Sequence, residues 1–148
     1  MTAAGEPVPE DPFDIAVVGG GAGGVLCAIH ALRMSKPDVR IILVEPEPVL
    51  ARGVAYATAL PEHLLNVPAR RMSAFDSKPD DFVEFLVAAE PEAAPQTLAN
   101  GYAQRRQYGE YLRQRLWQAR EASATTLVVL RDRVEALNRE HGGLRLEL

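Results

Sequence analysis

The chain reads FDIAVVGGGAGGVLCAIHALRM over residues 13–34, and this stretch decides the fold. It begins with an apolar run that ends at Val18, as expected for a strand buried on both faces of a parallel sheet. Glycine then dominates the next six residues, and apolar residues recur at helical spacing to about Met34. A strand, a glycine-rich turn and a helix form the first half of a βαβ unit.

The glycine turn has the spacing of a dinucleotide-binding loop. Gly19 permits the tight turn, Gly21 lets the backbone approach a pyrophosphate, and Gly24 lets the helix pack against the strand. The N-terminus of the following helix offers free N–H groups and a partial positive charge to the phosphates. We therefore predict a cofactor-binding loop made of Gly19, Gly20, Gly21, Ala22, Gly23 and Gly24.

A second buried strand is predicted over residues 39–45, and Glu45 ends it. Glu45 stands about 20 residues after the glycine turn, where an acid typically accepts hydrogen bonds from the adenosine ribose hydroxyls. A carboxylate there would repel a 2′-phosphate, so we do not expect the site to hold NADP. A flexible glycine loop and a solvated acid are the alternatives, but the order of strand, turn, helix, strand and acid favours an α/β fold of Rossmann type.

The chain after Glu45 departs from regular βαβ repeats. Residues 50–75 show no long periodicity, although they contain many apolar residues. The further predicted elements are a short helix over 82–89, a loop over 90–101, a longer helix over 104–121, a buried strand over 125–130, and a hairpin with arms at 134–138 and 144–148. A helical excursion after the second strand, followed by a hairpin, is the layout of FAD domains rather than of NAD domains.

Composition excludes several other classes of protein. The chain has 148 residues, a length that suits one domain. Its net charge of −4 argues against binding to nucleic-acid phosphates. No apolar run approaches the roughly 20 residues that a membrane span needs. The single cysteine, Cys27, excludes an internal disulfide framework, and we expect it to be buried in the first helix. His30, His63 and His141 have no spacing that makes a metal site.

The two ends of the chain carry separate predictions. Residues 1–12 are rich in Pro, Gly, Ala and acids, so we predict a disordered leader, which lacks the features of a signal peptide. We therefore expect a cytoplasmic location. Residues 13–148 are predicted to be the N-terminal part of one FAD/NAD(P)-binding domain, incomplete at the C-terminus because the chain stops at the hairpin, before that domain's last sheet strand.

Six motifs of the chain, taken in order, resemble one protein family. They are VVGGGAGGV (17–25), LVEP (43–46), RGVAY (52–56), HLLNVPA (63–69), RMSAF (71–75) and RRQYGEYL (105–112). Together they resemble the N-terminal part of the bacterial FAD/NAD(P)-binding proteins. That family includes FAD-dependent urate hydroxylases and nitrosuccinate-forming L-aspartate N-monooxygenases.

The resemblance implies FAD as the bound cofactor and NAD(P)H as the electron donor. It implies that the glycine turn and Glu45 contact the pyrophosphate and ribose of FAD, that Arg52 and Asn66 lie in segments that reach toward the flavin, and that Val134 offers a backbone contact to the adenine. For the intact protein it implies a monooxygenase that hydroxylates a small polar substrate. Two alternatives stay open: a flavin reductase or dehydrogenase without oxygen insertion, and a truncated, non-catalytic dinucleotide-binding module.

Overall fold

The computed structural model describes residues 12–140 and 142–148, so residues 1–11 of the predicted leader, and His141, lie outside the described residues. The elements, in chain order, are β1 (Ile15–Val18), α1 (Ala22–Met34), β2 (Arg40–Val44), α2 (Gly53–Tyr56), η1 (Ala69–Arg71), α3 (Asp81–Ala89), α4 (Pro95–Asn100), α5 (Arg105–Ala122), β3 (Thr126–Leu130), β4 (Ala136–Glu140) and β5 (Gly143–Glu147). Among the described residues, no helix combines the length and the apolar character that crossing a membrane requires.

Strands β1, β2 and β3 form a parallel sheet with β2 in the middle. Ile15 of β1 pairs with Ile41 of β2, and Arg40 of β2 pairs with Thr126 of β3. Helix α1 connects β1 to β2, and α5 leads into β3. The predicted α/β fold of Rossmann type is therefore confirmed, as is the antiparallel hairpin, which β4 and β5 form.

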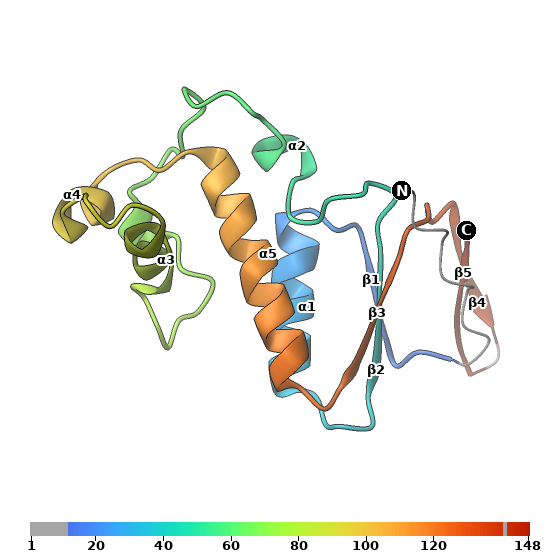
Figure 1. Cartoon of the computed structure of the whole chain (residues 1–148). Coiled ribbons are helices and arrows are strands. Elements are labelled where there is room, and N and C mark those ends of the chain that lie inside the picture. The colour runs from blue at the N-terminus through green and yellow to red at the C-terminus, as the bar shows by residue number, and fades with distance from the viewer. Residues whose placement is uncertain (1–11, 141) are drawn as a thin grey trace, which may run out of the picture.

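Helices α1 and α5 lie side by side on one face of the sheet, and the β4–β5 hairpin lies on the other (Figure 1). The helices bury a large core against β2, which includes Ile29 from α1 and Leu112 from α5. On the hairpin side, Leu146 of β5 packs against a smaller cluster made of Ile42, Val44 and Leu130. Helices α3 and α4 lie beyond α5, away from the sheet (Figure 1). This layering leaves the loops at the carboxyl ends of β1 and β2 free to form a site.

Three predictions about local structure are wrong. In β1, Ala16 and Val18 are exposed, because β1 forms an edge of the described sheet and the hairpin-side cluster does not include them. Cys27 is also exposed, because the core face of α1 carries positions 25, 28, 29 and 32 and leaves residue 27 on another face. The predicted loop at 90–101 contains α4, which begins at Pro95, where the N–H that proline lacks is not needed.

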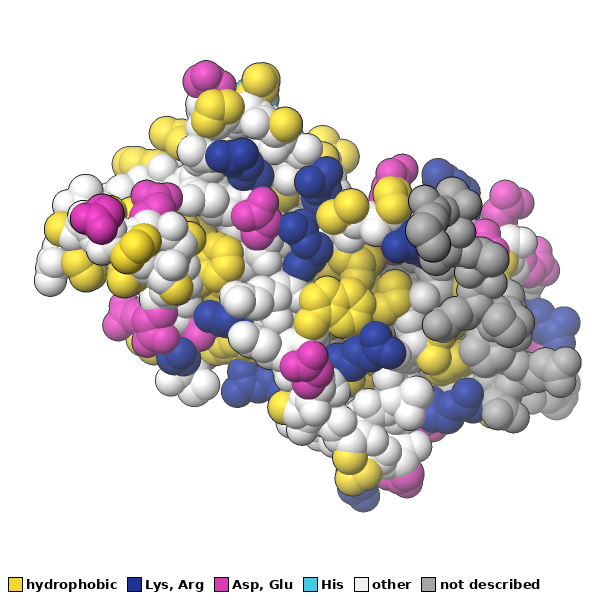
Figure 2. Space-filling view, in the orientation of Figure 1, with side chains coloured by type: hydrophobic (Ala, Val, Ile, Leu, Met, Phe, Trp, Pro, Cys, Tyr) yellow, Lys and Arg dark blue, Asp and Glu magenta, His cyan; other side chains and the backbone are white. Residues whose placement is uncertain are grey.

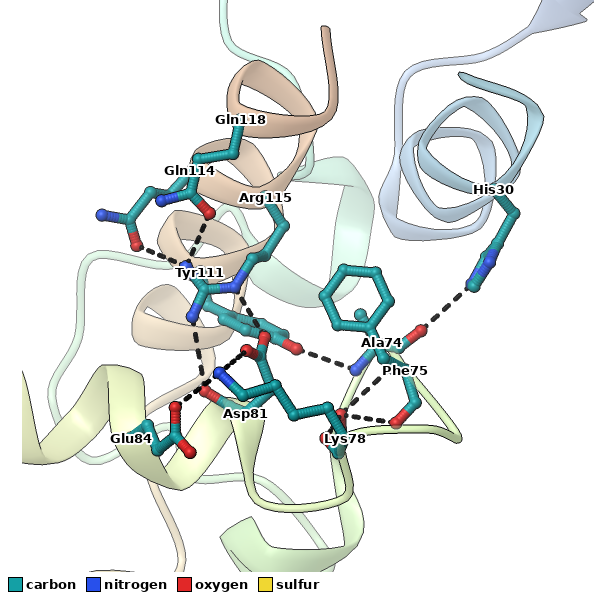
Figure 3. Close-up of polar contacts among 11 residues, drawn as sticks. His30, Ala74, Phe75, Lys78, Asp81, Glu84, Tyr111, Gln114, Arg115 and Gln118 are labelled. Carbon is teal, nitrogen blue, oxygen red and sulfur yellow. Dashed lines mark hydrogen bonds and ion pairs between the residues drawn. The ribbon is translucent and has the colours of Figure 1, made fainter. Parts of the chain in front are cut away.

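Polar contacts tie the segment before α3 to both α1 and α5 (Figure 3). The N–H of Ala74 donates to the hydroxyl of Tyr111 on α5 (2.8 Å), and the ring of His30 on α1 donates from Nε2 to the carbonyl of Ala74 (3.0 Å). Burial raises the pKa of Tyr111, so its hydroxyl stays neutral. These contacts fix α5 relative to α1 in addition to their shared apolar core.

Asp81, the first residue of α3, is the charged centre of this network (Figure 3). Its carboxylate is buried and forms ion pairs with Arg115 Nε (2.6 Å) and Lys78 Nζ (3.0 Å). Burial by itself raises the pKa of Asp81, but the hydrogen bonds from Arg115 and Lys78 outweigh burial and hold that pKa below its usual value. Asp81 therefore favours the folded state most when it is ionised.

We expect the stabilisation by Asp81 to be lost in acid. A carboxyl whose pKa is lowered by folding stabilises the protein above its unfolded pKa of about 3.9, and this stability disappears as pH falls through the folded pKa. Urea unfolding at pH 7 should show Asp81→Asn about 1.5–3 kcal/mol less stable than wild type. Between pH 7 and pH 3, Asp81→Asn should lose less of its unfolding free energy than the wild type loses. Asp80→Asn, which changes an exposed neighbouring acid, is the control. Equal acid losses in Asp81→Asn and wild type would contradict this assignment.

Candidate functional site

The glycine turn is bound to the end of β2 by two hydrogen bonds. Gly19 has a φ of 94°, a left-handed conformation that glycine adopts without steric cost. Its N–H donates to the carbonyl of Val44 (2.8 Å). The N–H of Gly20 donates to the carboxylate of Glu45 (2.5 Å). The turn and the predicted ribose-binding acid therefore lie in direct contact.

Two glycines of the turn stand where a side chain would not fit. A Cβ on Gly24 would lie 1.8 Å from the carbonyl oxygen of Gly19, and a Cβ on Gly20 would lie 2.8 Å from the Cβ of Glu45. Real Cβ atoms essentially never come within 3.0 Å of such atoms. The close approach of α1 to β1 that was predicted for Gly24 is therefore present in the structure.

The N-terminus of α1 is open. Gly21 is its N-cap, no side chain caps the helix, and no acidic residue occupies the first turn. A Cβ on Gly23 would meet nothing within 4 Å, and a Cβ on Gly21 would meet only the Cα of Gly53, at 3.8 Å. Helix N-terminal N–H groups without a capping side chain attract anions, because the helix dipole adds a partial positive charge. This end of α1 thus suits a pyrophosphate.

Glu45 lies immediately after β2 and is half-buried. Its backbone N–H donates to the carbonyl of Leu130 on β3 (3.0 Å). Its carboxylate accepts the N–H of Gly20 (2.5 Å) through one oxygen and the N–H of Glu47 (3.0 Å) through the other. A carboxylate has about four acceptor positions, so Glu45 retains capacity for the hydroxyl groups of a ligand.

A cavity of about 420 Å³ lies between the glycine turn and the segment after β2. Its volume is within the range of small-molecule sites, roughly 300–1,000 Å³. It is lined by Gly20, Glu45, Glu47, Pro48, Val49, Arg52, Gly53, Val54 and Ala57. Three predicted site residues, Gly20, Glu45 and Arg52, are thus brought together. Residues 47–49 also line the cavity and were not among the predicted site residues, although they directly follow the predicted acid.

The segment opposite the glycine turn is held in a strained conformation. Ala51 is a non-glycine residue with a φ of 59°, and Gly53 has a φ of 46°. The N–H of Ala51 donates to the carbonyl of Gly20 (2.7 Å), which fixes the segment against the turn. Non-glycine residues such as Ala51 are uncommon in this region of φ and persist where surrounding contacts hold them, often beside bound ligands. Nothing in the sequence pattern pointed to Ala51.

Asn66 and Val134 are not among the residues that line this cavity. Asn66 is exposed, next to Leu65, whose N–H donates to the carbonyl of Ala103 (2.9 Å). Val134 packs against the cluster that contains Val44 on the hairpin side of the sheet. Their contacts with a cofactor stay predictions.

Apolar side chains are exposed at the cavity and in the loop after α2. Val54 lines the cavity and is fully exposed, whereas Leu60 and Leu64, which are about half exposed, lie in the loop after α2 and do not line it. Figure 2 shows hydrophobic side chains at the top of the view, where Figure 1 places the loop after α2. The cavity therefore has a charged end at Glu45 and an apolar rim at Val54, which suits a ligand with a polar part and an aromatic part.

These residues fit a dinucleotide cofactor. The glycines leave room for close approach, the N-terminus of α1 favours a pyrophosphate, and Glu45 has free acceptor capacity for a ribose. A family model described as FAD-NAD(P)-binding matches residues 16–148, so the match includes the turn, Glu45 and the whole lining of the cavity. No curated protein matches the chain significantly.

Solved structures of two monooxygenases share the fold of this chain at low sequence identity. The flavin-dependent monooxygenase PieE, solved with FAD and substrate, aligns with a TM-score of 0.50 at 15% identity over 93% of this chain. The p-nitrophenol 4-monooxygenase PnpA from Pseudomonas putida DLL-E4 aligns with a TM-score of 0.50 at 16% identity over 90% of this chain. THI4 from Thermovibrio ammonificans aligns with a TM-score of 0.46 at 17% identity over 90% of this chain. The chain spans 27%, 35% and 45% of these three proteins, respectively.

Proposed function

Because this chain belongs to the family of FAD-NAD(P)-binding proteins, we propose that it is the FAD-binding portion of a flavin-dependent oxidoreductase that takes electrons from NAD(P)H. The observation that carries the proposal is the glycine turn hydrogen-bonded to Glu45 beside a 420 Å³ cavity. Bound FAD would supply the electron transfer, because such redox chemistry belongs to the cofactor. Residues 13–148 are proposed to belong to one domain.

The chain's own residues would divide the binding of FAD among them. The N–H groups at the start of α1 would hold the pyrophosphate, and the carboxylate of Glu45 would accept hydrogen bonds from the ribose hydroxyls. Arg52, on the opposite side of the cavity, would add a positive charge. Asn66 and Val134 are proposed as further contacts, toward the flavin and the adenine respectively.

Within this class we propose a monooxygenase that acts on a small polar substrate. The motifs resemble a family that contains hydroxylases, and two proteins of similar fold, PieE and PnpA, are monooxygenases. In the protein that carries this chain, NAD(P)H oxidation should be coupled to an oxygenated product. Reduction of an artificial acceptor without such a product would indicate a flavin reductase or dehydrogenase. FAD binding without NAD(P)H oxidation would indicate a non-catalytic binding module.

Glu45→Gln should weaken FAD binding by about 1–3 kcal/mol, because a neutral amide is a poorer acceptor for ribose hydroxyls than a carboxylate. The matched control is Glu47→Gln, which removes the same charge from the same cavity lining. Fluorescence titration with FAD measures both dissociation constants. Equal FAD affinities for Glu45→Gln, Glu47→Gln and wild type would show that Glu45 does not bind the ribose.

A further inference from the structure

Gly109 stands in the interior of α5, a helix of 18 residues, and is buried. Glycine destabilises a helix interior relative to alanine, because it loses more backbone freedom on folding. Tyr108 and Leu112, which lie within one turn of Gly109 on α5, are large and buried. A missing side chain at this position therefore calls for a steric reason.

The structure supplies that reason in the segment opposite the glycine turn. A Cβ on Gly109 would lie 2.9 Å from the carbonyl oxygen of Ala51 and 3.4 Å from the Cβ of Tyr56. The nearer atom belongs to the backbone, so it cannot move aside as the end of a flexible side chain could. The bare backbone of α5 thus rests directly on Ala51.

Ala51 cannot yield easily, because it is held on its other side. It is completely buried, has a φ of 59°, and its N–H donates to the carbonyl of Gly20 (2.7 Å). A non-glycine residue at positive φ has a narrow range of allowed conformations, so the direction of its carbonyl is fixed. If α5 displaced Ala51, the glycine turn would therefore be displaced with it.

Leu50, the residue before Ala51, also contacts both α5 and the glycine turn. Arg113, one turn further along α5, donates from Nη1 to the carbonyl of Leu50 (3.5 Å). A Cβ on Gly20 would lie 2.6 Å from Cδ2 of Leu50, so the side chain of Leu50 also packs on the glycine turn. Helix α5 therefore contacts two consecutive residues that both touch Gly20, which lines the cavity.

We propose that Gly109 is a positioning residue of the FAD site: its missing side chain lets α5 hold Ala51 against Gly20 and so sets the position of residues 50–53 relative to the glycine turn. The proposal rests on the proposed FAD binding. Gly109 itself does not line the cavity, and its effect is transmitted through the backbone of Ala51.

FAD titration of purified variants tests this role. Gly109→Ala should raise the dissociation constant for FAD by about tenfold or more, whereas Glu110→Ala, at the neighbouring exposed position of α5, should leave it within about twofold of wild type. Ala51→Gly should rescue Gly109→Ala, because glycine at residue 51 lets the carbonyl turn away from the new methyl group. The double variant should bind FAD within about threefold of the Ala51→Gly single variant.

Each other outcome decides against the inference or against its premise. Unchanged FAD affinity in Gly109→Ala, or a loss that Ala51→Gly does not rescue, overturns the role of Gly109. If Gly109→Ala also lowers the melting temperature, Arg115→Met serves as a destabilised reference remote from the cavity lining, and an equal loss of FAD affinity in both overturns it as well. Absence of FAD binding by the wild type would instead refute the proposed function.

Discussion

Gly24→Ala should weaken FAD binding by at least about 100-fold and destabilise the fold by about 1–3 kcal/mol or more. The new Cβ would lie 1.8 Å from the carbonyl oxygen of Gly19 and 3.4 Å from Cγ1 of Val17. Because the nearer atom is backbone, α1 must move away from β1, and its N-terminal N–H groups must move away from the pyrophosphate position. Thermal unfolding and FAD titration measure the two losses.

Gly23→Ala is the matched control for stability. It lies in the same turn of α1, is exposed, and its Cβ would meet nothing within 4 Å. Alanine there should leave the stability unchanged or raise it by about 0.5–1 kcal/mol, because alanine is the better helix former. A Gly24→Ala variant that melts and binds FAD as the wild type does would disprove the steric account of the turn.

Arg115→Met should destabilise the chain by about 3 kcal/mol at pH 7. The substitution keeps a long side chain but leaves Lys78, whose side chain is half exposed, as the cation that still pairs with the buried carboxylate of Asp81. It also removes the guanidinium that lies 5.1 Å from the ring centre of Tyr111. FAD affinity at a temperature where the variant is folded should change by less than about threefold, since neither residue of the pair lines the cavity.

A double-mutant cycle separates the ion pair from the loss of packing. If Asp81 and Arg115 stabilise each other, combining Asp81→Asn with Arg115→Met should cost less than the sum of the two single changes. Arg120→Met, at an exposed position of the same helix, should change the free energy of unfolding by no more than about 0.5 kcal/mol. Strict additivity in the cycle would show that the contact contributes nothing specific.

The fold follows from local patterns that the sequence displays. The βαβ unit was predictable because the apolar runs before Gly19 and before Glu45 flank a helix of clear period. The exposure of Val18 was not, because an apolar strand looks the same at the edge of a sheet as at its centre. The burial of Cys27 was predicted wrongly for a related reason. A small apolar residue between buried helical positions can be assigned to a face of the helix only when the positions of the core-facing residues are known.

Only one side of the candidate site, made of the glycine turn and Glu45, was predictable from the sequence. Gly24 and Glu45 stand at spacings that a dinucleotide fold requires, and the structure brings the glycine turn and Glu45 into contact. The opposite wall depends on Ala51 and Gly109, which are 58 residues apart in the chain and meet only after α5 has packed. Such a long-range backbone contact leaves no periodic signal. A single glycine inside an otherwise helical pattern was the only available sign of it.

A competition titration tests whether this chain binds FAD through the glycine turn and Glu45. Flavin absorption and fluorescence are recorded as FAD is added to the purified chain, and ADP or 2′-phospho-ADP is then added. We expect saturable binding of FAD with a dissociation constant of about 1 μM or tighter. ADP should displace FAD because it shares the pyrophosphate and ribose, whereas 2′-phospho-ADP should compete poorly because Glu45 repels its extra phosphate. Absence of saturable FAD binding, or equal displacement of FAD by the two nucleotides, would show that the glycine turn and Glu45 do not bind FAD in this way.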